Sequence, residues 1–163
     1  SQCTCLIRSP QLLEQRRSEG RTEQPAAVVV SRSPDFSSAW RFFNQPLQRW
    51  LLAPEPVDQG FDRWFPLAPT WSERLQALGA AGIQRLVLLG GAQLSADLLQ
   101  ADCVDALQLT LVPQLLGGRF SWLPCTNAPL PAALAQPGAW QSEGAEDLGD
   151  GEWLVRYRRI RSG

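Results

Sequence analysis

A short apolar run that ends in two glycines constrains the fold of this chain more than any other feature. Residues 85–89 read Arg-Leu-Val-Leu-Leu, and such a run is typical of a strand buried on both faces. Gly90 and Gly91 end the run, and leucines then recur at helical spacing through residues 92–100. The pattern predicts a strand that passes through a tight turn directly into a helix.

Other segments carry the signatures of further strands and helices. Strands are expected over residues 26–31, 49–53, 63–67, 104–112, 140–143 and 152–159. A helix is expected over residues 71–78, and residues 8–24 are expected to form an exposed polar connector with at most a helical turn. The Asp150-Gly151 pair predicts a hairpin between the last two strands.

These elements predict a single α/β domain over residues 1–163. Because helices alternate with several of the strands, we expect three layers, with a mixed, mostly parallel sheet and helices on both faces. The last two strands would add a C-terminal antiparallel hairpin.

The composition excludes several classes of function. The formal net charge of −1 provides no broad basic surface for nucleic acid or for an anionic membrane. No apolar run reaches the roughly 18 residues of a spanning helix, and the polar start does not resemble a signal peptide, so a cytoplasmic protein is expected. The chain has no His and no Lys, which excludes Ser-His-Asp, Cys-His and Schiff-base catalysis.

The cysteines are expected to be small apolar residues in a reducing compartment. They are Cys3, Cys5, Cys103 and Cys125. The spacing of Cys3 and Cys5 leaves a metal clip open as the alternative, but zinc sites usually use a wider spacing and a second pair of ligands. We therefore expect no metal.

The two glycines also suggest a binding chemistry. Glycine lets the backbone approach a ligand closely, and the free N–H groups of a helix's first turn attract phosphate. A Gly-Gly pair alone more often forms a plain tight turn, and the longer G-x-G-x-x-G pattern of dinucleotide folds is missing here.

The sequence around the glycines resembles a known family. Residues 81–94, AGIQRLVLLGGAQL, are similar to the "gi-x-x-llveGGa-x-l" segment of the reductase domain of riboflavin biosynthesis, which has a dihydrofolate-reductase-like fold. The similarity continues through residues 98–107 and through LTLVPQLLGG at residues 109–118, which resembles "lvDel-x-l-x-iaPxllGG". Looser matches precede and follow this block in the same order.

The resemblance implies an NADPH-dependent pyrimidine reductase. Its substrate would be 5-amino-6-(5-phosphoribosylamino)uracil, or the diaminopyrimidinone precursor, whose ribosyl side chain is reduced. The residues implied to bind the cofactor phosphates are Gly90, Gly91, Ala92, Gln93 and Leu94. Ser31, Arg32 and Ser33 would hold the adenosine 2′-phosphate, a dianion that an Arg and two hydroxyls suit; the alternative for Arg32 is a solvated loop charge.

The resemblance also implies residues that bind the substrate and a homodimeric assembly. Arg8 matches the arginine of the family's "P-x-LtvR" segment, which holds the substrate's ribose phosphate; the alternative is a surface arginine. Leu89 occupies a position that would contact or influence the substrate. The family also implies a homodimer with the C-terminal strands near the interface, and a structural role for Asp105 at the start of a strand.

The chain departs from the family pattern in two places. Leu89 stands where the family usually has Glu, and the family's opening "SLDG" strand and "G-x-GT" strand have no counterpart here, so an N-terminally truncated domain is expected. These departures keep a second hypothesis open, a non-catalytic, dimerising or nucleotide-binding relic of the same fold. A third hypothesis keeps the chemistry and changes the substrate to another pterin-like or pyrimidine compound.

Overall fold

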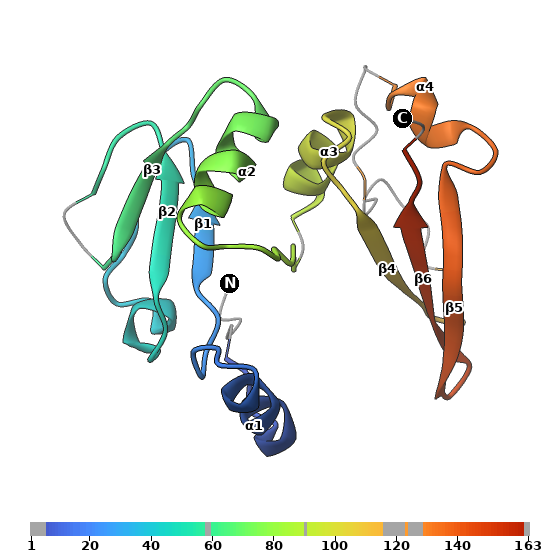
Figure 1. Cartoon of the computed structure of the whole chain (residues 1–163), viewed down its shortest axis with the longest axis horizontal. Helices are drawn as coiled ribbons and strands as arrows, with labels where there is room; N and C mark the ends of the chain where they lie inside the picture. Colours follow the sequence, from blue (N-terminus) through green and yellow to red (C-terminus); the bar gives the residue numbers. More distant parts are fainter. Residues whose placement is uncertain (1–5, 58–59, 90, 116–122, 124–128, 162–163) are drawn as a thin grey trace. The chain divides into compact units, whose positions relative to one another are not determined.

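A computed structural model describes residues 6–57, 60–89, 91–115, 123 and 129–161 (Figure 1). The chain divides into two compact units, one formed by the residues up to Pro69 with Glu73–Leu78 and one by Thr70–Ser72 with the residues from Gly79 onward. Within the described ranges, every helix is too short or too polar to cross a membrane.

The first unit contains a parallel sheet with the strand order β1-β2-β3. Its strands are β1 (Ala27–Val30), β2 (Arg49–Ala53) and β3 (Arg63–Pro66). The unit also contains helix α1 (Pro10–Ser18), the 3-10 helix η1 (Arg41–Asn44) and most of helix α2 (Trp71–Ala80). Val28 pairs with Trp50, and Leu51 pairs with Trp64, so β2 has a strand on each side.

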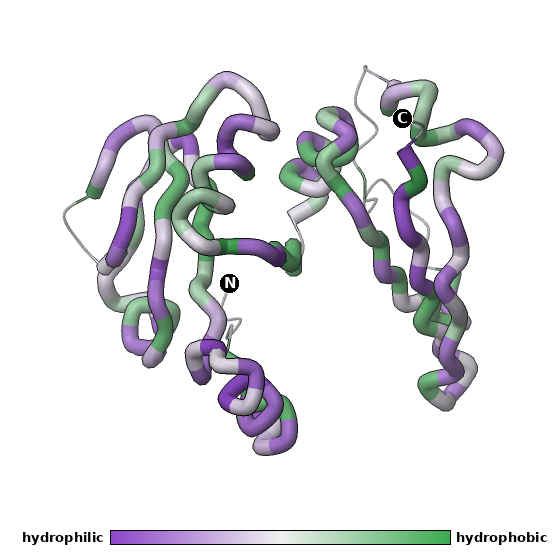
Figure 2. Tube along the Cα trace, viewed as in Figure 1, coloured by the Kyte–Doolittle hydropathy of each residue, from purple (hydrophilic) through white to green (hydrophobic). Residues whose placement is uncertain are grey.

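The core of this unit lies on β2. Leu51, Leu52 and Ala53 have no exposed surface, and Trp50 is also buried. Because neighbouring residues of a strand point to opposite faces, this pattern shows that β2 is covered on both faces, as the unbroken apolar run predicts. Figure 2 shows the contrast between this hydrophobic strand and the mainly hydrophilic α1. Each buried leucine contributes about 2 kcal/mol relative to an exposed one.

Phenylalanine rings from two loops and η1 form a second cluster in the first unit. The centroids of Phe36 and Phe61 lie 5.3 Å apart, and those of Phe43 and Phe61 lie 5.6 Å apart at an interplanar angle of 90°. Gly60 lies against this cluster with a φ of +79°, and a Cβ there would lie 2.6 Å from Cε1 of Phe43. The close packing of the ring therefore requires glycine at this position.

Replacing Gly60 with alanine is expected to lower the free energy of unfolding by about 3 kcal/mol, since it adds both backbone strain and overlap with the Phe43 ring. Urea denaturation measures the change. Gly20→Ala is the matched control, because Gly20 has a φ of +69° and open space around its Cβ position. It should cost only about 1 kcal/mol, the strain alone. Equal losses in the two variants would contradict the packing role of Gly60.

The second unit contains an antiparallel sheet with the strand order β4-β6-β5. Its strands are β4 (Ala106–Leu111), β5 (Trp140–Gly149) and β6 (Glu152–Arg159), and its helices are α3 (Ala92–Gln100) and α4 (Ala132–Ala135). β5 and β6 form the predicted hairpin, whose turn residues Gly149, Asp150 and Gly151 all have positive φ values. This backbone geometry explains why two glycines and an aspartate occupy the turn.

The sheet of the second unit has two chemically different faces. Leu107 pairs with Tyr157 and Leu109 with Val155, which places apolar side chains on one face. The opposite face carries the ion pairs Arg156–Glu146, at 2.7 Å, and Arg158–Glu143. Alternate residues of β4 therefore belong to an apolar face and a polar face of the sheet.

The α/β class, the parallel strands and the C-terminal hairpin are confirmed, but the described strands form two three-stranded sheets. The strand predicted over residues 85–89 is wrong, because this run pairs with no described strand; Val87 is 75% exposed and Leu89 80%. An apolar run encodes a preference for burial, whereas a strand also needs a hydrogen-bonding neighbour.

The predicted connector over residues 8–24 is also wrong in its extent, since α1 is a full helix of nine residues. Ser9 caps it, Pro10 begins it, and it has no buried residue. Local contacts support it instead: Gln15 Nε2 donates to Glu19, and Arg17 pairs with Glu14. A helix without an apolar stripe gives no periodic signal in the sequence.

Candidate functional site

The strongest candidate for an anion site is the N-terminus of α3. Gly90 lies outside the described residues. Gly91 is the N-cap residue, with φ +92° and ψ +91°, and no side chain caps the helix. Its carbonyl accepts a hydrogen bond from the N–H group of Ser95 at 2.9 Å, which begins the helical ladder. The N–H groups of the first turn precede that ladder, so no backbone carbonyl of the helix can satisfy them.

The side chains of this first turn leave the helix end electrically favourable for an anion. The turn has no acidic residue, and the Gln93 side chain donates to Asp97 Oδ1 at 2.9 Å, along the helix and away from its N-terminus. The buried Ala96, Leu98 and Leu99 anchor the helix. Gly91, Ala92, Gln93 and Leu94 therefore form one backbone site with partial positive charge.

Ser31, Arg32 and Ser33 lie immediately after β1. The N–H group of Ser31 donates to the Leu52 carbonyl at 3.0 Å, and the Ser33 carbonyl accepts from the N–H group of Asp35 at 2.8 Å. Ser31 is half-buried, whereas Arg32 and Ser33 are exposed. They leave the carboxyl end of a parallel sheet, the end at which α/β proteins usually bind ligands.

Arg8 lies between a fixed residue and a helix cap. The preceding residue, Ile7, is hydrogen-bonded through its main chain to the side chain of Gln24. The following residue, Ser9, caps α1 with a 3.4 Å contact from the N–H group of Leu12. The Arg8 side chain is exposed.

The predicted site residues fall into two groups. Arg8 and residues 31–33 belong to the first unit, whereas Leu89 and residues 91–94 belong to the second. The structure thus brings residues 91–94 together at one helix end and residues 31–33 together at one strand end.

Two hollows stand out among the described residues of the first unit, and neither is lined by a predicted site residue. One, of about 430 Å³, is lined by Thr22–Gln24, Pro46–Gln48 and Asp62. These segments lie just before β1, β2 and β3, so the hollow lies at the amino ends of the parallel strands. The other, of about 300 Å³, borders Phe36, Phe43 and Gly60 of the aromatic cluster.

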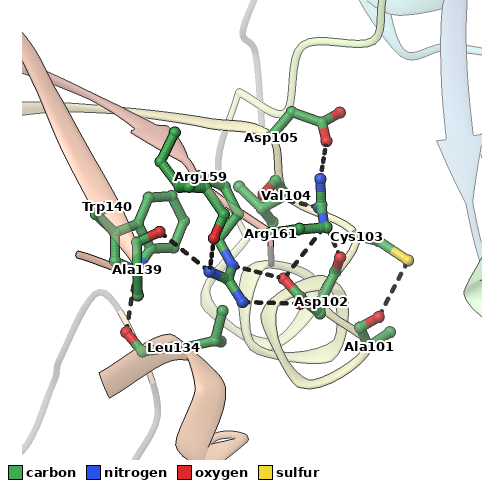
Figure 3. Close-up of polar contacts among 11 residues, drawn as sticks. Ala101, Asp102, Cys103, Val104, Asp105, Leu134, Ala139, Trp140, Arg159 and Arg161 are labelled. Atoms are coloured by element: carbon green, nitrogen blue, oxygen red, sulfur yellow. Dashed lines mark hydrogen bonds and ion pairs between the residues drawn. The ribbon is translucent and has the colours of Figure 1, made fainter. Parts of the chain in front are cut away.

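The densest polar network of the second unit surrounds Arg159 (Figure 3). The side chain of Arg159 is only 5% exposed, and its guanidinium makes a bidentate contact with Asp102, at 2.9 and 3.0 Å. It also donates to the carbonyls of Ala139 and Ile160. Nearby, Arg161 donates to the Asp105 carboxylate at 2.6 Å and to the Asp102 carbonyl at 2.7 Å.

The charges of this network are fixed by their contacts. The hydrogen bonds from Arg159 lower the pKa of Asp102, against the opposing effect of burial. The hydrogen bond to Asp105 raises the pKa of Arg161, and burial raises the pKa of the Cys103 thiol. At neutral pH the carboxylate is therefore ionised and the thiol protonated. The network ties the end of α3 and the start of β4 to the end of β6, which is a structural role.

Sequence reasoning found neither the Asp102–Arg159 pair nor the Gln24–Ile7 contact. The two residues of the pair are 57 positions apart, and an Arg in the basic run of residues 156–161 has the signature of a solvated charge. The expected structural role of Asp105 agrees with its position directly before β4. In the part of the chain that the structure describes, no group of three or more His, Cys, Asp or Glu residues is arranged to hold a metal.

Comparison with known sequences connects these features to one family. The family profile of the RibD C-terminal domain matches residues 3–149. Riboflavin biosynthesis protein RibD from Haemophilus influenzae is 29% identical over 153 residues, which cover 88% of this chain and 41% of that protein. The 2,5-diamino-6-ribosylamino-4(3H)-pyrimidinone 5′-phosphate reductase of Archaeoglobus fulgidus is 26% identical over 129 residues, which cover 73% of this chain and 59% of that protein. The matches thus span about two fifths to three fifths of these relatives.

Solved structures show the same fold. Acinetobacter baumannii RibD, form 2, aligns with 98% of this chain and 44% of its own, with a TM-score of 0.74 and 22% identity. A pyrimidine reductase-like protein from Corynebacterium diphtheriae aligns with 96% of this chain and 70% of its own, with a TM-score of 0.70 and 19% identity. The dihydrofolate-reductase-like fold of the reductase domains, expected from the sequence, is therefore confirmed.

Proposed function

Because this chain belongs to the family of RibD C-terminal domains, we propose that it is the reductase part of an enzyme of riboflavin biosynthesis. It would reduce the ribosyl side chain of 5-amino-6-(5-phosphoribosylamino)uracil, or of the diaminopyrimidinone precursor, with NADPH. The name of the Haemophilus influenzae relative supports the pathway, and that of the Archaeoglobus fulgidus relative supports a pyrimidine substrate that carries a ribose phosphate. A cytoplasmic homodimer belongs to the same proposal.

The N-terminus of α3 carries this proposal. Gly91 adopts a backbone conformation that side chains disfavour, no side chain occupies the cap, and the first turn holds no carboxylate. These features fit the phosphates of a dinucleotide, which would receive hydrogen bonds from the N–H groups of residues 91–94. Bound NADPH would supply the hydride that converts the ribosyl side chain to a ribityl chain.

The other residues of this chain would bind and orient. Arg32, with the hydroxyls of Ser31 and Ser33, would select the 2′-phosphate that distinguishes NADPH from NADH. Arg8 would hold the ribose phosphate of the substrate, next to the positive end of α1. Leu89 would border the substrate without a charge, so the residue before the glycines neither donates nor accepts a proton here.

Replacing Arg32 with alanine is expected to weaken NADPH binding about tenfold and to leave NADH binding nearly unchanged, since only NADPH carries the 2′-phosphate. Titration of each nucleotide, followed by its fluorescence, measures both dissociation constants. Arg41→Ala is the matched control, because Arg41 is an exposed arginine of the same unit that belongs to η1 and not to the segment that follows β1. A wild-type chain that binds neither nucleotide would refute the cofactor role.

Leu89 favours a second candidate, a nucleotide-binding relic without catalysis. It replaces the family's Glu beside the glycines, and it is 80% exposed. A relic would bind NADPH and oxidise none of it when the pyrimidine substrate is added. Turnover of NADPH on addition of the substrate would exclude the relic, and the same assay with other pyrimidines or pterins would define the substrate.

A further inference from the structure

The side chain of Gln24 engages both main-chain polar groups of Ile7, the residue before Arg8. Oε1 of Gln24 accepts from the Ile7 N–H group at 2.8 Å, and Nε2 donates to the Ile7 carbonyl at 3.0 Å, across 17 residues of sequence. Both contacts are partly buried. A carboxamide bound at both ends fixes the position and the orientation of the peptide, as a neighbouring strand would.

The main chain of residues 22–24 is itself held by hydrogen bonds. Thr22 Oγ1 donates to the Gln24 carbonyl at 2.8 Å, and Arg16 Nε donates to the carbonyls of Thr22 and Glu23 at 2.9 and 3.1 Å. Three residues after Gln24, the N–H group of Ala27 donates to the Gln48 carbonyl at the start of the parallel sheet. Gln24 therefore connects Ile7 to the sheet.

Arg8 lies between two restrained neighbours. Ile7 is held by Gln24, and Ser9 is held as the cap of α1, whose first turn contains Pro10 and no acidic residue. The guanidinium of Arg8 is exposed and makes no hydrogen bond or ion pair within the part of the chain that the structure describes. The backbone of Arg8 is thus fixed while its side chain stays available to an anion.

We propose that Gln24 is a positioning residue for Arg8. It holds the Ile7 peptide so that the Arg8 guanidinium and the N-terminus of α1 face the phosphate of the substrate together. A preorganised arginine loses less freedom when the phosphate binds, which strengthens binding. This inference rests on the proposed role of Arg8 and adds a residue that does not touch the substrate.

The test compares four variants with the wild-type chain. Gln24→Leu removes both contacts to Ile7 at similar side-chain volume. Gln48→Leu is the matched control, because Gln48 is an exposed glutamine that lines the same hollow and does not contact Ile7. Arg8→Ala and the Arg8→Ala/Gln24→Leu double variant complete the cycle. Calorimetry measures the dissociation constant of ribose 5-phosphate, with ribose as the ligand without phosphate, and hydrogen exchange reports the Ile7 amide.

The expected results separate positioning from general stability. Arg8→Ala should weaken ribose 5-phosphate binding about tenfold or more, and Gln24→Leu about fivefold, with faster exchange of the Ile7 amide. Gln48→Leu should bind as the wild type does. Because Gln24 acts through Arg8, the double variant should bind within about twofold of Arg8→Ala alone.

Two results would overturn the inference while the phosphate site stands. The first is a Gln24→Leu variant that binds ribose 5-phosphate as tightly as the wild type does. The second is a Gln24→Leu substitution that weakens this binding equally in the wild-type chain and in Arg8→Ala, because an equal loss of affinity indicates a purely structural role. If Arg8→Ala has no effect, the proposed substrate site itself fails, and the role of Gln24 fails with it.

Discussion

Replacing Gly91 with aspartate is expected to weaken NADPH binding by about a hundredfold or more. Gly91 has a φ of +92°, a conformation that L side chains rarely adopt, and the new carboxylate would lie at the helix end where the cofactor phosphates would bind. Like charges in such proximity cost several kcal/mol, and every 1.4 kcal/mol is about tenfold in affinity. Fluorescence titration with NADPH measures the change.

Two further variants separate the effect of the aspartate charge from that of backbone strain. A Cβ at Gly91 meets only Leu94, at an ordinary 3.7 Å, so Gly91→Ala adds backbone strain without overlap or charge and should have an intermediate effect. Gly138→Asp is the matched control, because Gly138 belongs to the same unit, has a φ of +81° and has open space around it. Unchanged affinity in Gly91→Asp, with unchanged folding, would refute the phosphate site on α3.

Replacing Asp102 with asparagine is expected to lower the free energy of unfolding by about 2 to 3 kcal/mol, because the buried Arg159 loses its counter-charge. Asparagine is chosen since Asp102 has a φ of +49°, which Asn tolerates. The value lies below that of a fully buried pair because the Asp102 side chain is 31% exposed. Urea denaturation of both proteins measures the difference.

Asp105→Asn provides the control for charge alone. The Asp105 side chain is 85% exposed and also pairs with an arginine, Arg161, so its loss should cost less than about 1 kcal/mol. Equal losses of unfolding free energy in Asp102→Asn and Asp105→Asn would show that the burial of Arg159 does not increase the contribution of its ion pair to stability.

The difference in the free energy of unfolding between the wild type and Asp102→Asn should decrease as the pH falls. The hydrogen bonds from Arg159 lower the pKa of Asp102 in the folded chain, so the folded state favours the ionised form more than the unfolded state does. The stabilisation is complete above the unfolded pKa of about 4 and is lost as the pH falls through the lower folded value. The unfolding curves of the two proteins should therefore differ at neutral pH and converge as the pH falls through the lowered pKa of Asp102.

Local sequence patterns were sufficient where burial and turn chemistry determine the structure. The β2 strand and the α3 helix have the bounds that the sequence predicts, because an unbroken apolar run and a leucine periodicity each have one simple solution. The strand predicted over residues 85–89 does not form, since apolar character does not specify a pairing partner. The helix α1 exceeds the predicted single turn, because capping and exposed side-chain contacts support it.

Local sequence patterns also predict one part of the candidate site and miss another. The sequence indicated the candidate anion site at the N-terminus of α3, because glycines followed by a helix leave free N–H groups at the helix end. The contact of Gln24 with Ile7 and that of Asp102 with Arg159 span 17 and 57 residues. Such pairs depend on how distant segments meet, which no local pattern records.

The strand order of the second unit has a consequence for folding while the chain is synthesised on the ribosome. β6 is the central strand of the order β4-β6-β5, yet it is the last strand of the described chain, and it also carries Arg159, the partner of Asp102. β4 and β5 therefore have no neighbour to pair with until β6 has been synthesised. The first unit, whose sheet is complete by Pro66, can fold while the second is still being translated. Until β6 emerges, β4 lacks the strand that pairs with it, and its apolar face favours aggregation.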